Sequence, residues 1–355
     1  MTRRGESSAQ VDRSFHRCGA QAVLAAALAA AGGLAAMSAG TGPAVKEVDI
    51  RRFNFVFTAV SAIPADAEVL RLWVPLPQSD DGQEITNLRL ETTPPLPHRF
   101  AQENEFGNTI AFIESDAGAG ADLPDQIEVR LSFDVERREI SENREAPVSD
   151  ADADRLLEGD RLAPITNEVR RRTEEAIAGK ETVTEQARAI YDRVLADMQY
   201  DKSGQGWGQG DIQHACDVGK GNCSDFHALF ITMARAAGIP AYFEIGYPLP
   251  LDKAEGEIGG YHCWGWFQDE AGVWRPVDAS EADKDPSKTD YYFGTLCCNR
   301  VALTKGRDLV IDPAPASAGD SINFLVYPII EIDGKAAPAK SVTRRITFRD
   351  LDEDE

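Results

Sequence analysis

The sequence predicts an α+β protein in which a helix bundle packs on an antiparallel sheet, preceded by an all-β, sandwich-like module. Three observations predict this class. Residues 47–140 contain alternating runs of Val, Ile, Phe and Leu separated by Pro, Gly, Asp and Asn, as in antiparallel strands. Residues 166–240 instead place apolar residues at helical spacing between capping residues. Strand-like runs return at 241–247, 261–267 and 273–279.

The length of 355 residues gives room for about two domains. The changes in pattern predict this order: 1–39 a signal peptide, 45–145 the N-terminal β module, 146–181 a linker and helix, 182–312 an α+β core, and 313–355 C-terminal strands with an acidic tail.

The chain is strongly acidic, with a formal net charge of −22, 43% hydrophobic residues and 27% charged residues. The hydrophobic content is sufficient for a packed core. A field of this sign repels phosphate groups, so nucleic acid and anionic lipid surfaces are not expected as partners.

The N-terminus has the features of an export signal. Basic residues, Arg3 and Arg4 among them, precede the uncharged run "AVLAAALAAAGGLAAM", which is followed by small residues. We expect export to the periplasm or beyond, by an undetermined route, and no integral membrane segment after cleavage. An uncleaved anchor remains open, although the run is short for one.

Export changes how the cysteines are interpreted. Cys18 would leave with the signal, and an odd number remains, so at least one thiol is free or joins another chain. The pairing among the others stays open; they are Cys216, Cys263, Cys297 and Cys298 beside Cys223.

Two helices are expected before the central motif. Thr166 can cap residues 167–178, which end at Gly179, and Thr182 with Glu185 forms a capping box before 186–198. The glycine-rich loop 200–211 follows and contains Trp207, without the Lys-Ser/Thr ending of a phosphate loop.

The next helix has the strongest local signals. Asn222 is a favoured N-cap, Asp225 stands at the third helical position, and Gly238 followed by Pro240 ends the helix. Cys223 is therefore the first helical residue, where unpaired N–H groups and the helix dipole favour a thiolate.

The register of a predicted β-hairpin gives a partner for this thiol. A turn at 269–272 sets the sum of opposed residue numbers at about 540–542, and His262 plus Asp278 gives 540. We expect the two side chains to face each other or to be slightly offset. The imidazole then takes the thiol proton, and the carboxylate orients the ring. The Cys223 N–H and Trp207 are the candidate oxyanion donors.

The stretches "GNCSDFHALFITMARAAGIPAYFEIGYP", "YHCWGWF" and "WRPVDAS" resemble the transglutaminase-like superfamily, within the papain-like class of cysteine enzymes. The resemblance covers roughly 182–312. It implies a papain/transglutaminase-like fold, with Cys223 as nucleophile, His262 as base and Asp278 as the acid that orients it. It also implies acyl transfer from amides, as crosslinking, proteolysis or amide hydrolysis, although some members are not catalysts.

Two differences from animal transglutaminases limit which properties of the superfamily are expected here. Ser224 stands where animal transglutaminases usually have Trp, which indicates the bacterial branch of the superfamily. No EF-hand-like loop is present, so calcium dependence is not expected. We therefore predict no cofactor and no metal.

Other interpretations concern the residues around the triad. His214, Cys216, Cys223 and His227 have spacing that a zinc site could use, but structural zinc sites usually show closer cysteine pairs. We expect His227 and Asn222 to support the nucleophile. Trp264 either lines the substrate pocket or fills the core, and 252–260 is either a lid or a surface loop.

We expect an exported enzyme that hydrolyses peptide or isopeptide amides through a thioester. The alternatives are a transamidating crosslinker and a catalytically silent peptide-binding protein. The expected partner is a peptide or protein substrate, and the sequence leaves its identity and the oligomeric state open.

Overall fold

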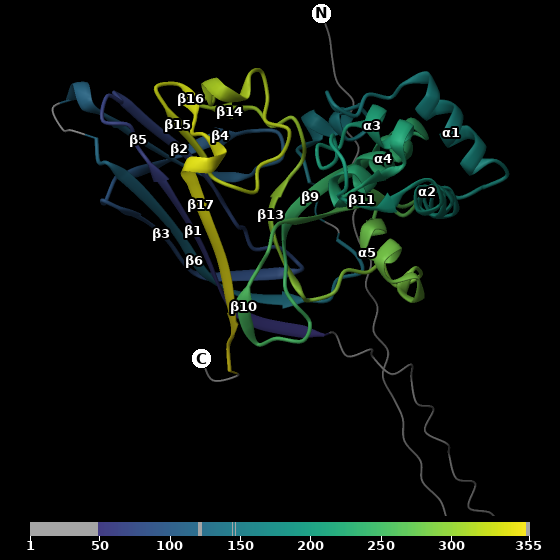
Figure 1. Ribbon diagram of the computed structural model, residues 1–355. Coiled ribbons are helices and arrows are strands. Elements are labelled where there is room, and N and C mark those ends of the chain that lie inside the picture. The colour runs from purple at the N-terminus through teal and green to yellow at the C-terminus, as the bar shows by residue number, and fades with distance from the viewer. Residues whose placement is uncertain (1–48, 120–122, 144, 146, 353–355) are drawn as a thin grey trace, which may run out of the picture. The chain divides into compact units, whose positions relative to one another are not determined.

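The computed structural model describes residues 49–352, except 120–122, 144 and 146 (Figure 1). The predicted signal peptide, residues 1–39, and the end of the acidic tail lie outside the described residues. Within the described part, no helix is long and apolar enough to cross a membrane.

The first sheet joins strands from both ends of the chain. Its order is β10-β17-β1-β6-β3, and its strands are β1 (Ile50–Ala62), β3 (Gln83–Thr93), β6 (Gln126–Arg138), β10 (Glu255–Glu257) and β17 (Val342–Asp350).

The second sheet has the order β14-β4-β5-β2-β15-β16. Its strands are β2 (Val69–Leu76), β4 (His98–Glu103), β5 (Thr109–Asp116), β14 (Ile311–Asp312), β15 (Ile329–Ile332) and β16 (Lys335–Ala336). Alternate residues of β1 and β6 are buried, and Phe55 and Val129 of the first sheet share one apolar cluster with Leu72 of the second. The predicted sandwich-like packing follows from this alternation.

The third sheet carries His262, one of the predicted site residues. Its order is β12-β11-β9-β13, with β9 (Ala241–Pro248), β11 (His262–Gln268), β12 (Trp274–Val277) and β13 (Arg300–Lys305), and a short parallel pair joins β7 (Gln199–Tyr200) to β8 (Lys220–Gly221). The helices are α1 (Asn167–Ile177), α2 (Val183–Asp197), α3 (Ile212–Val218), α4 (Cys223–Ala236) and α5 (Ala279–Lys284). Figure 1 shows these helices gathered beside β9 and β11. The predicted α+β class is confirmed.

The helix starts agree with the predicted caps. The Thr166 side chain accepts from Val169 N, and Thr182 and Glu185 form the predicted capping box. Two short helices, α3 and α5, were not predicted, because each is too short to show an apolar stripe.

α4 is buried on nearly every side, from Cys223 to Arg235. α4 packs on β9 and β11, while α1, α2, α3 and α5 cover the rest of its surface. The Arg235 guanidinium is satisfied inside this packing by Asp160 at 3.1 Å. Cys223, the predicted nucleophile, therefore lies at the start of a buried helix.

The C-terminal strands extend the N-terminal sheets. β17 pairs with β1 over 53–61, and β15 pairs with β2. Residues 313–355 thus contribute to the sheets of the predicted 45–145 module. The stretch 252–260, for which the sequence leaves a lid or a loop open, contains β10, which is hydrogen-bonded to β17.

Candidate active site

The first turn of α4 is built as its sequence predicts. The Asn222 side chain accepts a hydrogen bond from Ser224 N at 2.9 Å, and the Asp225 carboxylate accepts one from Asn222 N at 2.9 Å. Cys223 is the first residue of the helix and is 1% exposed. The thiol therefore lies at the positive end of the helix dipole, shielded from water.

Asp225 also holds the glycine-rich loop against this turn. Its carboxylate accepts from Gly208 N at 2.7 Å and from Gly210 N at 3.0 Å. Burial raises the pKa of Asp225 above its ordinary value, although these hydrogen bonds oppose the shift. The loop that contains Trp207 is thereby tied to the start of α4.

We expect Asp225→Ala to lower the free energy of unfolding by roughly 3 kcal/mol, because three buried N–H groups lose their acceptor. Urea denaturation measures this loss. Asp225→Asn keeps an acceptor oxygen and is the control. A loss below about 1 kcal/mol in the alanine variant would show that the loop does not depend on this carboxylate.

His262 begins β11 and is 3% exposed. In the sheet it lies opposite Gly246 of β9. Its Nε2 is 2.7 Å from Asp278 Oδ2, and its charge and a hydrogen bond from it lower the pKa of Cys223. The three predicted triad side chains are therefore brought together.

Asp278 reaches the imidazole by a route that differs from the predicted one. The observed pairing of Gly265 with Val277 sums to 542, so His262 and Asp278 are not opposed in the ladder. β12 ends at Val277, and Asp278 is the N-cap of α5, where its Oδ1 accepts from Glu281 N. The turn into α5 directs the carboxylate to the ring.

The electrostatics of the three groups reinforce one another. Burial alone would raise the pKa of Cys223, but hydrogen bonds from Cys263 and His262 and the charge on His262 bring it well below its ordinary value. Burial opposes protonation of His262, but the Asp278 carboxylate raises its pKa to about 10. Burial would also raise the pKa of Asp278, and the charges of His262 and Arg300 hold it well below its ordinary range. These pKa shifts all favour a thiolate–imidazolium pair beside a carboxylate.

Cys263 is a second thiol at the nucleophile that sequence analysis did not assign to the site. It is fully buried, and its Sγ lies 3.7 Å from His227 Nδ1 and 3.9 Å from Ser224 Oγ. Burial and the neighbouring thiolate raise its pKa, so it stays protonated and donates to Cys223.

We expect Cys263→Ala to raise the pKa of Cys223 by about one pH unit, since one hydrogen bond to the thiolate is lost. The rate of Cys223 alkylation by iodoacetamide, followed against pH by mass spectrometry, measures this change. The matched control is Cys298→Ala, which removes a buried thiol elsewhere. An unchanged pH profile in Cys263→Ala would exclude the donor role.

His227 connects the nucleophile to α5. Its Nδ1 is 2.8 Å from Cys223 O, and its Nε2 accepts from Ala279 N at 3.1 Å. Burial lowers the pKa of His227, so the ring is neutral and Nδ1 donates to the carbonyl. Both ring nitrogens are engaged in the protein, which argues against the zinc alternative. Within the part of the chain that the structure describes, no group of three or more His, Cys, Asp or Glu residues is arranged to hold a metal ion.

Arg300, on β13, is a site residue that sequence analysis missed. Its Nη1 donates to Asp278 Oδ2 at 2.9 Å, and its guanidinium lies 4.8 Å from the centre of the Trp264 ring. It is 2% exposed. A single arginine in an apolar strand does not indicate this contact in the sequence. The contact joins two elements that are separate in the chain.

Tyr261 is a second missed residue. Its hydroxyl accepts from Asn222 Nδ2 at 3.0 Å, lies 3.1 Å from Ser224 Oγ, and donates to Gly208 O at 3.3 Å. It therefore joins the residues on both sides of Cys223 to the glycine-rich loop.

The two candidate tryptophans have different environments. Trp207 is half-buried, and Lys202 Nζ lies 5.9 Å from its ring centre. Trp264 is fully buried, and its Nε1 donates to Glu244 Oε2. Trp264 thus packs behind His262 and Arg300 and fills the core.

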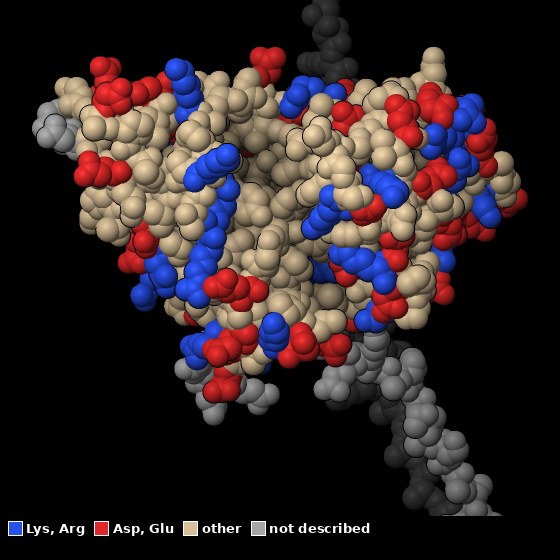
Figure 2. All heavy atoms as spheres, in the orientation of Figure 1, with Lys and Arg blue, Asp and Glu red and all other residues tan. Residues whose placement is uncertain are grey.

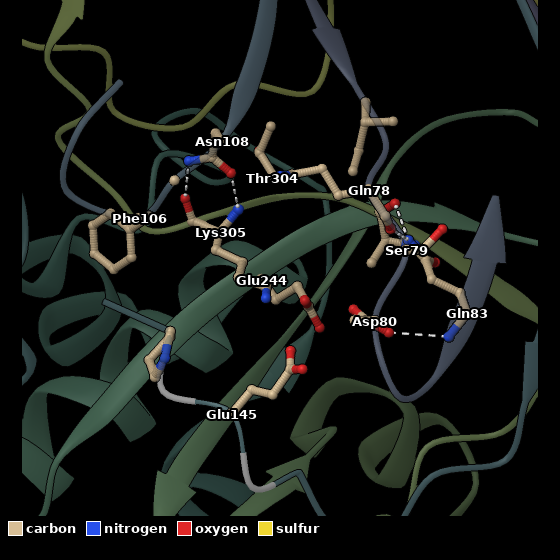
Figure 3. Close-up of a pocket in the computed structure, with 14 residues that line it drawn as sticks. Gln78, Ser79, Asp80, Gln83, Phe106, Asn108, Glu145, Glu244, Thr304 and Lys305 are labelled. Atoms are coloured by element: carbon tan, nitrogen blue, oxygen red, sulfur yellow. Dashed lines mark hydrogen bonds between the residues drawn. The ribbon is translucent and has the colours of Figure 1, made fainter. Parts of the chain in front are cut away.

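Glu244 also faces a cavity of about 170 Å³ on the other side of Trp264. Figure 3 shows the carboxylates of Asp80, Glu145 and Glu244 turned toward this space, with Lys305 at its edge. The triad residues do not line this cavity.

The described cysteines Cys216, Cys223, Cys263, Cys297 and Cys298 are all free. Cys18 lies outside the described residues. The nucleophile is therefore not blocked by a disulfide.

Comparison with known proteins finds similarity over the core and over the fold. Residues 170–279 match the family described as the transglutaminase-like superfamily. An uncharacterized protein of Haemophilus influenzae is 26% identical over 353 residues, which cover 88% of this chain and 94% of the relative. The crystal structure of a candidate cysteine protease from Cytophaga hutchinsonii aligns with a TM-score of 0.58 and 18% identity, covering 86% of this chain and 93% of that one. This structural likeness shows a shared fold.

Proposed function

We propose that this chain is a cysteine enzyme that attacks peptide or isopeptide amides, because its residues 170–279 match the family described as the transglutaminase-like superfamily. The observation that carries the proposal is the hydrogen-bonded arrangement of Cys223, His262 and Asp278 at the start of α4. It supports nucleophilic catalysis because the thiolate is formed before the substrate arrives.

The proposed reaction has two stages. The Cys223 thiolate adds to the amide carbonyl, and the Cys223 N–H stabilises the resulting oxyanion. We keep Trp207 as the second proposed donor, since Asp225 holds the neighbouring Gly208 against α4. The His262 imidazolium then protonates the leaving amine, and a thioester remains on Cys223.

In the second stage, neutral His262 takes a proton from water, and the hydroxide adds to the thioester. The carbonyl re-forms as the Cys223 thiolate leaves, and the carboxylic acid is released. The Asp278 carboxylate orients the ring in both stages. We propose hydrolysis as the main outcome, because no described group near the triad is recognisable as a binding site for an amine acceptor.

The molecular surface shown in Figure 2 has a shape that is compatible with a bound peptide. Figure 2 shows a hollowed, mostly uncharged region between β17 and the β9 and β11 strands, with Lys and Arg side chains on both sides. An extended peptide fits such a groove better than a compact anion does. We propose that the protein acts after export, on a peptide or protein of that compartment.

The test is to incubate the full chain with a peptide library, with and without a primary amine, and to analyse the products by mass spectrometry. Hydrolysis predicts fragments that gain water in both conditions. A crosslinker predicts peptides that carry the amine. Cys223→Ala should abolish either product. No Cys223-dependent product at all would contradict catalysis and favour the peptide-binding alternative.

A further inference from the structure

A cavity of about 370 Å³ opens between Tyr200 and Tyr261. We call it the tyrosine pocket and define it by these two residues together with Leu249, Ile258 and Gly259. Its volume is within the range of small-ligand sites. Its lining combines the apolar side chains of Leu249 and Ile258, which are buried in the core, with polar groups at the rim.

Tyr200 and Tyr261, which form two walls of the pocket, both contact residues close to Cys223 in the chain. Tyr200 pairs with Gly221 in the β7–β8 ladder, two residues before Cys223. Tyr261 precedes His262, and its hydroxyl contacts Asn222 and Ser224 on either side of Cys223. Both walls of the tyrosine pocket are therefore hydrogen-bonded to residues that flank Cys223.

The rim of the pocket carries an uncompensated cation. Lys202 lines the rim, and its Nζ lies 5.6 Å from the Tyr200 ring centre and 5.9 Å from that of Trp207. Among the described residues, no carboxylate forms an ion pair with Lys202. Glu257, at the same rim, is paired with Arg345 at 2.6 Å. In a chain of net charge −22, Lys202 gives this rim a local positive charge that attracts a carboxylate.

At Gly259, the backbone that lines the tyrosine pocket is accessible to a substrate. A Cβ placed on Gly259 would meet no atom within 4 Å, and the preceding Ile258 is fixed by a hydrogen bond from its N–H to Ile346 O. This segment leads directly into Tyr261 and His262. Gly259 itself is exposed.

We propose that the tyrosine pocket binds a bulky apolar side chain next to the attacked amide, and that Lys202 binds a carboxylate on the adjacent residue. The substrate class is thus a peptide that combines a large apolar residue and an acidic residue at the reacting bond. This proposal rests on the proposed function, but binding tests it separately from turnover.

The experiment measures binding to full-length Cys223→Ala by calorimetry. The probe is an acetylated, amidated pentapeptide Ala-Glu-Phe-Gln-Ala, compared with versions in which Phe is replaced by Ala or Glu by Lys. We expect the Phe-to-Ala change to weaken binding at least about tenfold, through lost apolar burial. The Glu-to-Lys change should weaken it about fivefold.

Two pocket variants, combined with Cys223→Ala, make the assignment specific. Lys202→Glu should reverse the preference between the Glu and Lys peptides. The matched control Lys180→Glu, an exposed lysine at the opposite end of α2, should leave the preference unchanged. Gly259→Leu fills the cavity without backbone strain and should reduce binding of the Phe peptide to the level of the Ala peptide.

Iodoacetamide is small enough to bypass the pocket, so single Gly259→Leu should still be alkylated at Cys223 at the wild-type rate. Equal affinity for the Phe and Ala peptides would overturn the apolar part of the proposal. An unchanged charge preference in Lys202→Glu would overturn the part played by Lys202. Either result stands whether or not the wild-type chain hydrolyses amides.

Discussion

His262→Ala is expected to reduce amide turnover by about 10⁴-fold or more. Without the imidazole, Cys223 loses a hydrogen-bond donor and the adjacent positive charge that lower its pKa, and the leaving amine loses its proton source. The measurement is kcat/KM on a peptide that the library screen identifies. Alkylation of Cys223 at pH 6 should slow in parallel.

The matched control is His98→Ala, which removes an exposed histidine on β4. It should retain wild-type turnover and stability. Far-UV circular dichroism and urea denaturation establish that His262→Ala is folded. Turnover within about tenfold of wild type in a folded His262→Ala protein would contradict the general-base assignment.

Arg300→Met is expected to lower the free energy of unfolding by about 3 kcal/mol or more. The guanidinium and the Asp278 carboxylate are both buried, and their contact is 2.9 Å. Methionine leaves the carboxylate with only His262 as its charged hydrogen-bond partner, in a region that water does not reach. Urea denaturation measures the loss of stability.

Arg345→Met is the control, because Arg345 pairs with Glu257 on the surface, where both side chains are more than half exposed. Its effect should stay within about 1 kcal/mol. If Arg300→Met were as stable as this control, Asp278 would not depend on Arg300. The assignment of Arg300 to the site would then be wrong.

The position of Cys223 at the start of α4 could be predicted from the sequence because its signals are local. Asn222 and Asp225 form the capping box within one helical turn, which fixes Cys223 as the first helical residue. The hairpin turn brought His262 and Asp278 into the same neighbourhood, although the pairing alone did not give their contact. A cap position and a turn depend only on residues close in the chain.

The residues that were missed make contacts between distant segments. Arg300 reaches Asp278 from another strand of the sheet, and Cys263 meets the nucleophile only because β11 packs on α4. Such contacts depend on tertiary packing, for which one sequence holds no pattern. The C-terminal strands are a similar case, since β17 looks like any alternating strand until its partner β1 is known.

The central claim is that His262 keeps Cys223 anionic, and the pH dependence of Cys223 alkylation tests it most directly. Iodoacetamide reacts with thiolates, so the rate constant follows the ionised fraction of the sulfur. Because the pKa of Cys223 lies well below its ordinary value and that of His262 is raised to about 10, the ion pair persists between these limits. The account predicts a rate constant at Cys223 that has already reached its plateau at pH 6 and is flat to pH 8. A rate constant that rises about tenfold per pH unit over this interval, as for an ordinary thiol, would contradict it.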